Sequence, residues 1–569
     1  MNLLLSRRFR TFLAVMLATT AHAATMQVEV LPPTLRVGVE GPRPGATSAD
    51  IYAAKNETES FQVLIRAVGG DIRKVNAEMA VMNGPINTLP ASVRIYREEL
   101  VPIRRPGYGP TLGTQFAPDP LVPFVDPFTN TPLGPAKWNE ETQQLEPGRF
   151  GGFGFDLRDG QHQVLWIDVA VPRDTAAGDY TSALSISAIG AETVVVPVRL
   201  HVWDFVLPDG PTHENHFGGF GYALAYDGKT RTPEEANALE ERYCATLAAN
   251  RINPPIPSYL KPPMNEDGSV NFDAVDVALT EFVTRYHLTN IEVPRAPFSD
   301  NLGVDRAKAI NFFRSWQDYL ERKGWLDRAY HYMLDEPNDP QAYEMVRQLG
   351  ALVQEAAPKL RRLVVEQPYS ETTEWGTLDA AIDIWCPLFG FVHEPNIERV
   401  RAQGDDVWSY SALVQNAPPY HPEYETVKND RPPYWEIDYP LTSYRIAPWL
   451  NRRYDITGLL YWSLCYWASP KRNPWDDPGF RGYWNGDGFL FYPGNDAGID
   501  GPIESIRLKA LRDGMEDYEY FVLLESLGGE EAVDAIVREA VPTWGTWAQD
   551  PDTMLTLRMR LAEEILKRK

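Results

Sequence analysis

Cysteine is scarce in this 569-residue chain: Cys244, Cys386 and Cys465 are the only three. An odd number of thiols cannot all pair within one chain, so a fold that depends on a disulfide framework is excluded. No CxxC or other zinc-ligand spacing occurs, and we expect neither a metal nor a cofactor. Each cysteine lies in an apolar segment, which predicts buried, free thiols.

Positive charge is also in short supply. The chain has 54 lysine and arginine residues against 78 aspartate and glutamate residues, a formal net charge of −24. Because nucleic acids are bound mainly through cationic contacts to phosphate, this balance excludes a nucleic-acid partner. Aromatic residues, in contrast, make up 12% of the chain. That excess suits stacking on flat apolar faces such as sugar rings, although a large core also uses aromatic side chains.

Long hydrophobic runs are absent apart from a short one near the N-terminus. A basic segment with Arg7, Arg8 and Arg10 precedes an apolar run over residues 11–18. A small-x-small cleavage pattern then ends at Ala23. This arrangement predicts a signal peptide over residues 1–23. The run is too short to span a membrane. We therefore expect an exported protein, periplasmic or secreted, with no membrane span.

Three regions follow the predicted signal peptide. Residues 24–208 contain many short β-branched runs between turn residues, which favours an all-β sandwich. Residues 212–500 alternate strand and helix patterns, which is typical of a (β/α)8 TIM-type barrel. Residues 501–569 predict C-terminal helices, the first of which begins at Pro502. Residues 104–160, rich in proline and glycine, form either a surface insertion or a loop that leans toward the barrel.

The expected barrel strands are short apolar runs that alternate with helical patterns. They are residues 217–222, 255–258, 290–293, 329–335, 363–367, 382–386, 407–412 and 458–467. Helices are expected over residues 232–250, 273–286, 305–323 and 340–356.

The most informative stretch runs from Ala329 to Pro337. An apolar, aromatic run ends there in two adjacent carboxylates, Asp335 and Glu336, and Pro337 cannot donate to a sheet. The pair is therefore expected at the carboxyl end of a strand, where parallel α/β folds carry their catalytic groups. A solvated strand-end turn is the alternative interpretation.

Two carboxylates in one dry pocket, about 4 Å apart, would repel each other by about 4 kcal/mol at an effective dielectric near 20. One would stay protonated as a general acid and the other would stay an anion. The acid and nucleophile of an ordinary retaining glycosidase lie about 5–5.5 Å apart on opposite sides of the sugar, which neighbours on one strand cannot easily achieve. Neighbours suit a substrate whose own 2-acetamido carbonyl oxygen attacks the anomeric carbon.

These residues resemble a known family. Asp335-Glu336 after an aromatic strand looks like the pair of glycoside hydrolase family 123, the β-N-acetylgalactosaminidases, and residues 505–520 are similar to the signature of the related domain of unknown function 4091. Residues 57–64 and 118–123 are also similar to that group. The resemblance implies a β-sandwich, a (β/α)8 barrel and a substrate glycan that carries N-acetylgalactosamine. It also implies substrate-assisted retention, with Asp335 stabilising an oxazoline and Glu336 as acid/base.

A glycan-binding site needs further polar and aromatic side chains around the pair. Candidates lie after barrel strands and in the loop that follows the eighth strand, where core or rim packing is the alternative role for each. Asp487 is predicted to bind a sugar hydroxyl, with a plain turn residue as the alternative. The predicted substrate-binding residues are Tyr369, Tyr410, Trp435, Trp467, Trp484 and Asp487; the same region holds Trp462, Tyr466, Trp475 and Asn485.

Two other functions stay open. A conventional retaining glycosidase would use Glu336 as acid/base and Glu366 or Glu436 as nucleophile. A non-catalytic carbohydrate-binding protein would keep the fold without turnover. His213 and His216 have the spacing of a ligand pair but are predicted to be solvated side chains. Arg507, Arg512 and Glu516 are predicted to form an internal ion-pair network.

Overall fold

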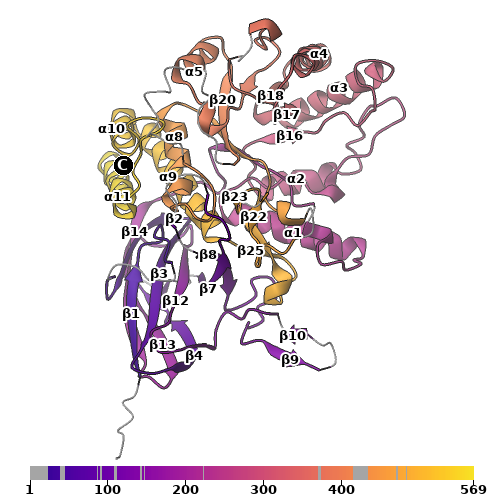
Figure 1. The fold of residues 1–569 in the computed structure, drawn as a ribbon. Coiled ribbons are helices and arrows are strands. Elements are labelled where there is room, and N and C mark those ends of the chain that lie inside the picture. The colour runs from indigo at the N-terminus through magenta and orange to yellow at the C-terminus, as the bar shows by residue number, and fades with distance from the viewer. Residues whose placement is uncertain are drawn as a thin grey trace, which may run out of the picture.

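The computed structural model describes residues 24–569 except 39–44, 86–87, 90–91, 108–111, 114, 141–143, 147, 222, 370–372, 414–432, 469–471 and 482–483. The predicted signal peptide lies outside the described residues. Figure 1 shows a β-rich N-terminal part in indigo, an α/β part above it, and the yellow C-terminal helices alongside the junction of the two.

Two sheets in the N-terminal part enclose one apolar core. The first has the order β1-β3-β12-β7-β8, and the second has the order β11-β4-β13-β14-β2. Phe61, Val63 and Ile65 alternate along β3 and pack into the same buried cluster as Leu184 and Val198 of the second sheet. This region therefore has the β-rich character that its short strand patterns predict.

The strands of the first sheet are β1 (Thr25–Leu31), β3 (Glu57–Val68), β12 (His162–Val171), β7 (Ser92–Pro102) and β8 (Phe116–Pro123). Those of the second are β11 (Phe155–Leu157), β4 (Ile72–Met79), β13 (Gly178–Ile189), β14 (Val194–Val206) and β2 (Ala49–Lys55), flanked by β5 (Met82–Asn83) and β6 (Thr88–Leu89). The stretch 104–160 contributes β8, β11 and a separate hairpin of β9 (Lys137–Asn139) and β10 (Gln144–Glu146).

The α/β part is built on a seven-stranded, wholly parallel sheet of order β15-β21-β20-β19-β18-β17-β16. Its strands are β15 (Glu214–Phe217), β16 (Ile291–Val293), β17 (Ala329–Asp335), β18 (Arg361–Val365), β19 (Ile384–Trp385), β20 (Asp406–Ser411) and β21 (Gly458–Tyr461). This is the strand order of a barrel from which the second strand is missing, so a closed eight-stranded barrel is not confirmed.

Proline explains the missing second strand. Pro254, Pro255 and Pro257 lack the N–H groups that a ladder needs. Residues 258–260 instead form a short 3-10 helix. Side-chain amides fill the gap between β15 and β16: the Asn253 N–H donates to Asn215 Oδ1 at 2.8 Å, and Asn253 Nδ2 donates to the Asn290 Oδ1 at 2.5 Å. Side-chain hydrogen bonds thus replace the expected ladder.

The four helices with predicted bounds lie close to them: α1 (Pro233–Ala249), α2 (Asp276–Arg285), α3 (Arg306–Lys323) and α4 (Pro340–Ala356). The structure adds three helices for which no bounds were predicted, α5 (Glu394–Arg401), α7 (Thr442–Arg445) and α8 (Ala447–Arg453). Thr232 and Glu235 form a reciprocal capping box at the start of α1, and Asp339 caps α4 by accepting from the Ala342 N–H at 2.7 Å.

The C-terminal part follows four short strands, β22 (Gly479–Phe480), β23 (Trp484–Asn485), β24 (Phe491–Pro493) and β25 (Pro502–Glu504). Its helices are α9 (Ile506–Ser526), α10 (Glu530–Ala540) and α11 (Pro551–Arg568). The helix predicted to begin at Pro502 begins at Ile506, because residues 502–504 pair with β24 and Ser505 caps the helix.

Helix α9 carries buried charges that pair with the N-terminal part. Arg507 Nε donates to Asp119 Oδ1 of β8 at 2.9 Å, and Lys509 Nζ lies 2.9 Å from Asp168 Oδ2 of β12. Arg512 Nη1 donates to the same Asp168 carboxylate at 3.1 Å. The predicted internal ion-pair network is confirmed, and it joins the two halves of the molecule.

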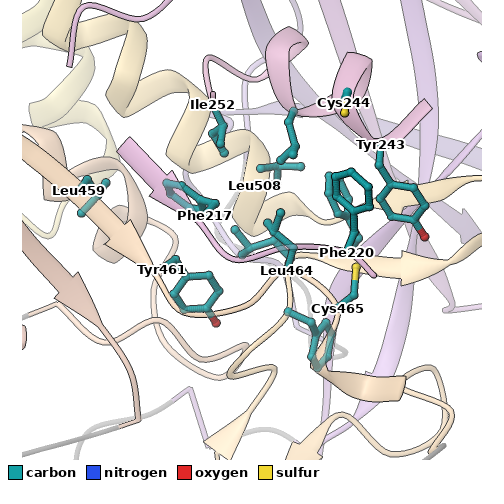
Figure 2. Close-up of a cluster of buried hydrophobic side chains, with 14 of the residues drawn as sticks. Phe217, Phe220, Tyr243, Cys244, Ile252, Leu459, Tyr461, Leu464, Cys465 and Leu508 are labelled. Atoms are coloured by element: carbon teal, nitrogen blue, oxygen red, sulfur yellow. The ribbon is translucent and has the colours of Figure 1, made fainter. Parts of the chain in front are cut away.

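The three cysteines are free and buried, as predicted. Figure 2 shows Cys244 and Cys465 within a cluster of apolar and aromatic side chains that includes Phe217, Phe220 and Tyr461. Burial raises the pKa of the Cys465 thiol well above its ordinary value, so this group stays a neutral core residue.

Replacing Arg507 should strongly destabilise the protein. Arg507→Met leaves the Asp119 carboxylate buried without its main cation, and such a loss costs about 3–5 kcal/mol. The midpoint of urea unfolding checks this. Arg538→Met, at an exposed position on α10, is the matched control and should change stability by less than about 0.5 kcal/mol. An equal effect of the two changes would show that the buried pair is not a stabilising contact.

His213 should make stability depend on pH. Its Nδ1 lies 3.0 Å from the Thr457 carbonyl oxygen and its Nε2 accepts from Asn451 Nδ2 at 2.9 Å, so the buried ring is neutral. Burial lowers its pKa to about 3. The unfolded chain takes up this proton below about pH 6.5, so stability is lost as pH falls from there toward 3.

We expect wild type to lose about 2 kcal/mol relative to His213→Gln between pH 7 and pH 5. Urea unfolding of both proteins at the two pH values checks this. The comparison of wild type with the variant removes the contribution of other titrating groups. Parallel losses in the two proteins would contradict the prediction.

Candidate active site

A β-bulge shapes the strand that ends at the carboxylate pair. Tyr332 is level with Leu363 of β18, whereas Leu334 is level with Val364, so Met333 is an extra residue in β17. Met333 and Leu334 consequently both pack toward the apolar cluster between the sheet and the helices.

The bulge brings Tyr332 and Asp335 to the same face. Residues three apart on a plain strand point to opposite faces. Here Tyr332 packs on the inner cluster of the sheet, and Asp335 is level with Val365, which belongs to that same cluster. The Tyr332 hydroxyl donates to Asp335 Oδ1 at 2.7 Å. The bulge therefore turns Asp335 onto the aromatic inner face.

Glu336 leaves the strand in an unusual backbone conformation. Its φ is +40°, a region that costs free energy for a residue with a side chain and that is found at functional sites. Its N–H still donates to the Val365 carbonyl at 3.1 Å. The Tyr410 hydroxyl of β20 donates to Glu336 Oε1 at 2.5 Å. A strained turn and a tyrosine from another strand thus hold Glu336.

Both tyrosines stay protonated and act as donors. Burial, and then the Asp335 carboxylate, raise the pKa of Tyr332 above its ordinary value. Burial, and then the Glu336 carboxylate, raise the pKa of Tyr410 well above its ordinary value. Each carboxylate accordingly accepts one hydrogen bond from a neutral phenol, which holds it in place without neutralising it.

The carboxylates do not share a dry pocket. Asp335 and Glu336 are both exposed residues, so the condition under which mutual repulsion would protonate one of them is not met. Each is bound by a different tyrosine, Tyr332 or Tyr410, from a different strand. The division of roles between the two carboxylates must therefore come from the substrate and its contacts.

Asp487 lies beside the segment that follows β20, the strand of Tyr410. Its Oδ1 accepts from the N–H of Leu413, which follows β20, while its Oδ2 has no hydrogen-bond partner. Burial raises the pKa of Asp487 to about 6. The indole of Trp462, just after β21, lies close enough to the Asp487 carboxylate to interact with it, although neither Trp462 Nε1 nor Asp487 Oδ2 makes a well-formed hydrogen bond. Buried polar atoms that are incompletely satisfied are unusual and call for an explanation, and a bound ligand is one.

The other predicted sugar-binding residues fall into two groups. Tyr369 and Trp484 are half-buried and follow or form strand ends. Trp435 and Trp467, in contrast, are fully buried, and their indole N–H groups donate to the carbonyls of Ser443 and Phe491. Trp435 and Trp467 are therefore core residues, which was the alternative to sugar binding.

Neither candidate for a conventional nucleophile is well placed. Glu366 and Glu436 are both buried. Neither oxygen of Glu436 has a hydrogen-bond partner, and burial, followed by Asp487 and Asp438, raises the pKa of Glu436 well above its ordinary value. A neutral carboxylic acid is not a nucleophile, so Glu436 does not suit that role.

The two histidines near the linker were predicted to be solvated, and this is wrong. His213 is buried, and His216 is half-buried with its Nδ1 2.6 Å from the Tyr330 hydroxyl. The His216 ring also lies edge-on to Tyr332. The sequence did not single out Tyr332, and it gave His216 no place in the site, because their positions depend on the bulge and on pairing between β15 and β21.

The described residues contain neither a metal-binding cluster nor a membrane-spanning helix. Within them, no group of three or more His, Cys, Asp or Glu side chains is arranged to hold a metal ion. No helix in the same residues has the length and apolar character needed to cross a membrane.

A parallel α/β sheet with two carboxylates at the carboxyl end of one strand defines an acid/base hydrolase type of site. A family model described as "Glycoside hydrolase 123, catalytic domain" matches residues 306–524, which include β17 and the carboxylate pair. Residues 306–524 therefore match a glycoside hydrolase 123 catalytic domain, and the family resemblance is confirmed over this part of the chain. This family indicates a hydrolase of glycosidic bonds.

Solved structures give a matching fold. One is a family 123 glycoside hydrolase from Clostridium perfringens, studied for glycolipid glycan hydrolysis; the match covers 96% of this chain and 98% of that chain at 12% identity, with a TM-score of 0.63. A GH5 xyloglucanase from Bacteroides ovatus, in complex with a XXXG heptasaccharide, matches over 86% of this chain and 100% of that chain at 9% identity. Its TM-score is 0.29, too low to indicate a shared fold. No curated protein matches the chain.

Removing the Tyr410 hydroxyl should slow glycoside hydrolysis. Tyr410→Phe deletes the 2.5 Å hydrogen bond to Glu336, and a bond to a charged group contributes about 1.5–3 kcal/mol. We therefore expect kcat/KM on an aryl glycoside to fall by about 10- to 100-fold. Tyr286→Phe is the matched control, because Tyr286 donates to Glu241 at the same 2.5 Å away from the site. Equal kcat/KM values for the two variants would show that the Tyr410 hydroxyl does not contribute to catalysis.

Proposed function

We propose that the protein is an exported glycoside hydrolase that cleaves terminal β-linked 2-acetamido sugars, with β-N-acetylgalactosaminide as the first choice of substrate. The proposed mechanism is substrate-assisted retention through an oxazoline. The family model supports the hydrolase class. The sugar, the mechanism and the export are the proposal.

The observation that carries the proposal is the separate anchoring of two adjacent carboxylates. Tyr332 holds Asp335 and Tyr410 holds Glu336, and both carboxylates remain exposed. A conventional retaining enzyme needs an ionised carboxylate across the sugar from the acid, about 5–5.5 Å away. Burial of Glu366 and Glu436 argues against that arrangement. A nucleophile supplied by the substrate removes the need for it.

In the proposed reaction Asp335 accepts a hydrogen bond from the acetamido N–H and orients that group. The acetamido carbonyl oxygen attacks the anomeric carbon while protonated Glu336 gives its proton to the leaving glycosidic oxygen. Asp335 stabilises the positive charge that develops on the oxazoline. Glu336 then takes a proton from the water that opens the ring, which restores the acetamido group with net retention.

Polar groups near the pair are proposed to bind the sugar. The Asp487 carboxylate and the Trp462 indole N–H are buried beside each other, and together they would offer an acceptor and a donor for hydroxyl groups. Tyr369 and Trp484 are kept as proposed contacts because they are only half-buried, unlike Trp435 and Trp467. Trp435 and Trp467 are not kept, because their indole groups are already bonded within the core.

Export is proposed from the first 23 residues alone. A basic segment, a short apolar run and a cleavage pattern support a signal peptide. The protein would act in the periplasm or outside the cell.

Aryl β-N-acetylgalactosaminide and β-N-acetylglucosaminide hydrolysis tests the function. Wild type should turn over at least one of them, and Glu336→Gln or Asp335→Asn should each lower kcat by about 100-fold or more, because general acid–base groups contribute that much. A thiazoline mimic of the oxazoline should inhibit wild type competitively. Asp339→Asn, in the same loop, is the control; Asn caps helix α4 as well as Asp does, so activity should persist.

Other results would replace the proposal. Turnover that ignores the thiazoline, or that occurs only on sugars without the acetamido group, would point to a conventional mechanism. Binding of glycans without turnover, unchanged by Glu336→Gln, would indicate a carbohydrate-binding protein on the same fold.

A further inference from the structure

A cavity opens where the second strand of the sheet is missing. Its volume is about 620 Å³, which falls in the range of small-ligand sites. It is lined by residues of β15, β16 and α3 and of the proline-rich segment after α1. We call it the side cavity; His216, Lys261, Arg295, Trp316 and Tyr330 are the lining residues that matter below.

The side cavity adjoins the carboxylate pair. Arg295 Nε donates to the Tyr332 carbonyl at 3.3 Å, and the Arg295 guanidinium lies over the Tyr332 ring. His216 lies edge-on to the same ring. Tyr332 in turn donates to Asp335. Tyr332 therefore links two lining residues of the side cavity, His216 and Arg295, to a proposed catalytic group.

Hydrogen-bond donors in the side cavity outnumber the acceptors available to them. Trp316 is 3% exposed, yet its indole Nε1 has no hydrogen-bond partner. A buried indole N–H normally finds an acceptor. Lys261 and Arg295 are exposed, and no carboxylate of the described residues lies within salt-bridge distance of either. In a chain of net charge −24, a cavity lined by two cations and a single carboxylate, Glu292, is a local excess of positive charge.

The remaining polar groups of the side cavity are already engaged. Asn215, Asn253 and Asn290 bond to one another. Glu292, the one carboxylate among the lining residues, has its Oε2 3.7 Å from His216 Nδ1, which is beyond hydrogen-bond distance. Two cations and a buried indole N–H against this one carboxylate leave the side cavity with a surplus of donors, which acceptor oxygens, ideally negatively charged ones, would satisfy.

We propose that the side cavity binds an acidic group, a sugar carboxylate or a sulfate ester, on the glycan unit next to the cleaved 2-acetamido sugar. This proposal rests on the proposed function, and it names the class of glycan that the enzyme prefers. Lys261 and Arg295 select the charge, and the Trp316 N–H binds one of its oxygens.

Two fluorogenic substrates measure this preference. The 3-carboxyumbelliferyl and 4-methylumbelliferyl β-N-acetylgalactosaminides share the cleaved sugar and differ in one charge on the leaving group. The quantity compared is the ratio of their kcat/KM values. Lys261→Gln and Arg295→Gln should each lower this ratio about two- to fivefold, the range for exposed ion pairs, and the double change should lower it further. Trp316→Phe should lower it as well.

The control is Arg538→Gln, an exposed cation on α10, which should leave the ratio unchanged. Raising the salt concentration should lower the ratio in wild type more than in the double variant, because salt screens exposed charges. A ratio that the double variant leaves unchanged, or raises, would overturn the proposal.

Calorimetry separates the failure of this proposal from that of the proposed function. It compares two β-N-acetylgalactosaminyl disaccharides, with glucuronic acid or galactose as the second sugar, and a sulfated galactose version distinguishes the two acid types. Glu336→Gln is used as the host so that no ligand is consumed. Tighter binding of an acidic disaccharide that Lys261→Gln weakens supports the side cavity even if no glycoside is hydrolysed. Equal binding of all three overturns it even in an active enzyme.

Discussion

The structure depends on the charges buried along α9. Arg507, Lys509 and Arg512 lie out of water, and an unpaired buried ion is costly, so each needs a carboxylate at a fixed place. Those carboxylates, Asp119 and Asp168, come from strands of the β-rich part. The two halves cannot shift relative to each other without leaving an ion unpaired. The pairs therefore set the relative position of the halves, which apolar contact alone would specify less strictly.

The same network reaches the candidate active site. Arg507 Nη1 donates to the Gly486 carbonyl at 2.8 Å, directly before Asp487, whose carboxylate in turn accepts from the Leu413 N–H. Gly486 has a φ of +83°, and an added Cβ would lie within 3 Å of Ile437 and of the Arg507 guanidinium, so glycine is favoured there. The loop that carries a proposed sugar-binding carboxylate is thus held by a charge pair with the β-rich part. Stability and site geometry share one residue, Arg507.

The bulge in β17 sets the orientation of the carboxylate pair. One extra residue, Met333, rotates the end of the strand so that Asp335 shares a face with Tyr332. The positive φ of Glu336 then turns its side chain toward Tyr410 on a different strand. Two neighbouring carboxylates are thereby held by two separate donors. The proposed substrate-assisted chemistry needs two carboxylates with different partners on one side of a sugar, and this arrangement supplies them.

Local sequence patterns predicted several of the elements and the candidate pair. Apolar periodicity, prolines and capping residues specify β17, α3 and α4 to within a residue or two, and Asp335-Glu336 stands out because Pro337 ends the strand. These signals are local, so one segment contains them. The missing second strand, the bulge at Met333, the burial of Trp435, Trp467 and His213, and the partners of Arg507 were decided by tertiary structure. Each depends on which distant segment lies opposite, and register and burial are properties of that pairing rather than of either segment alone.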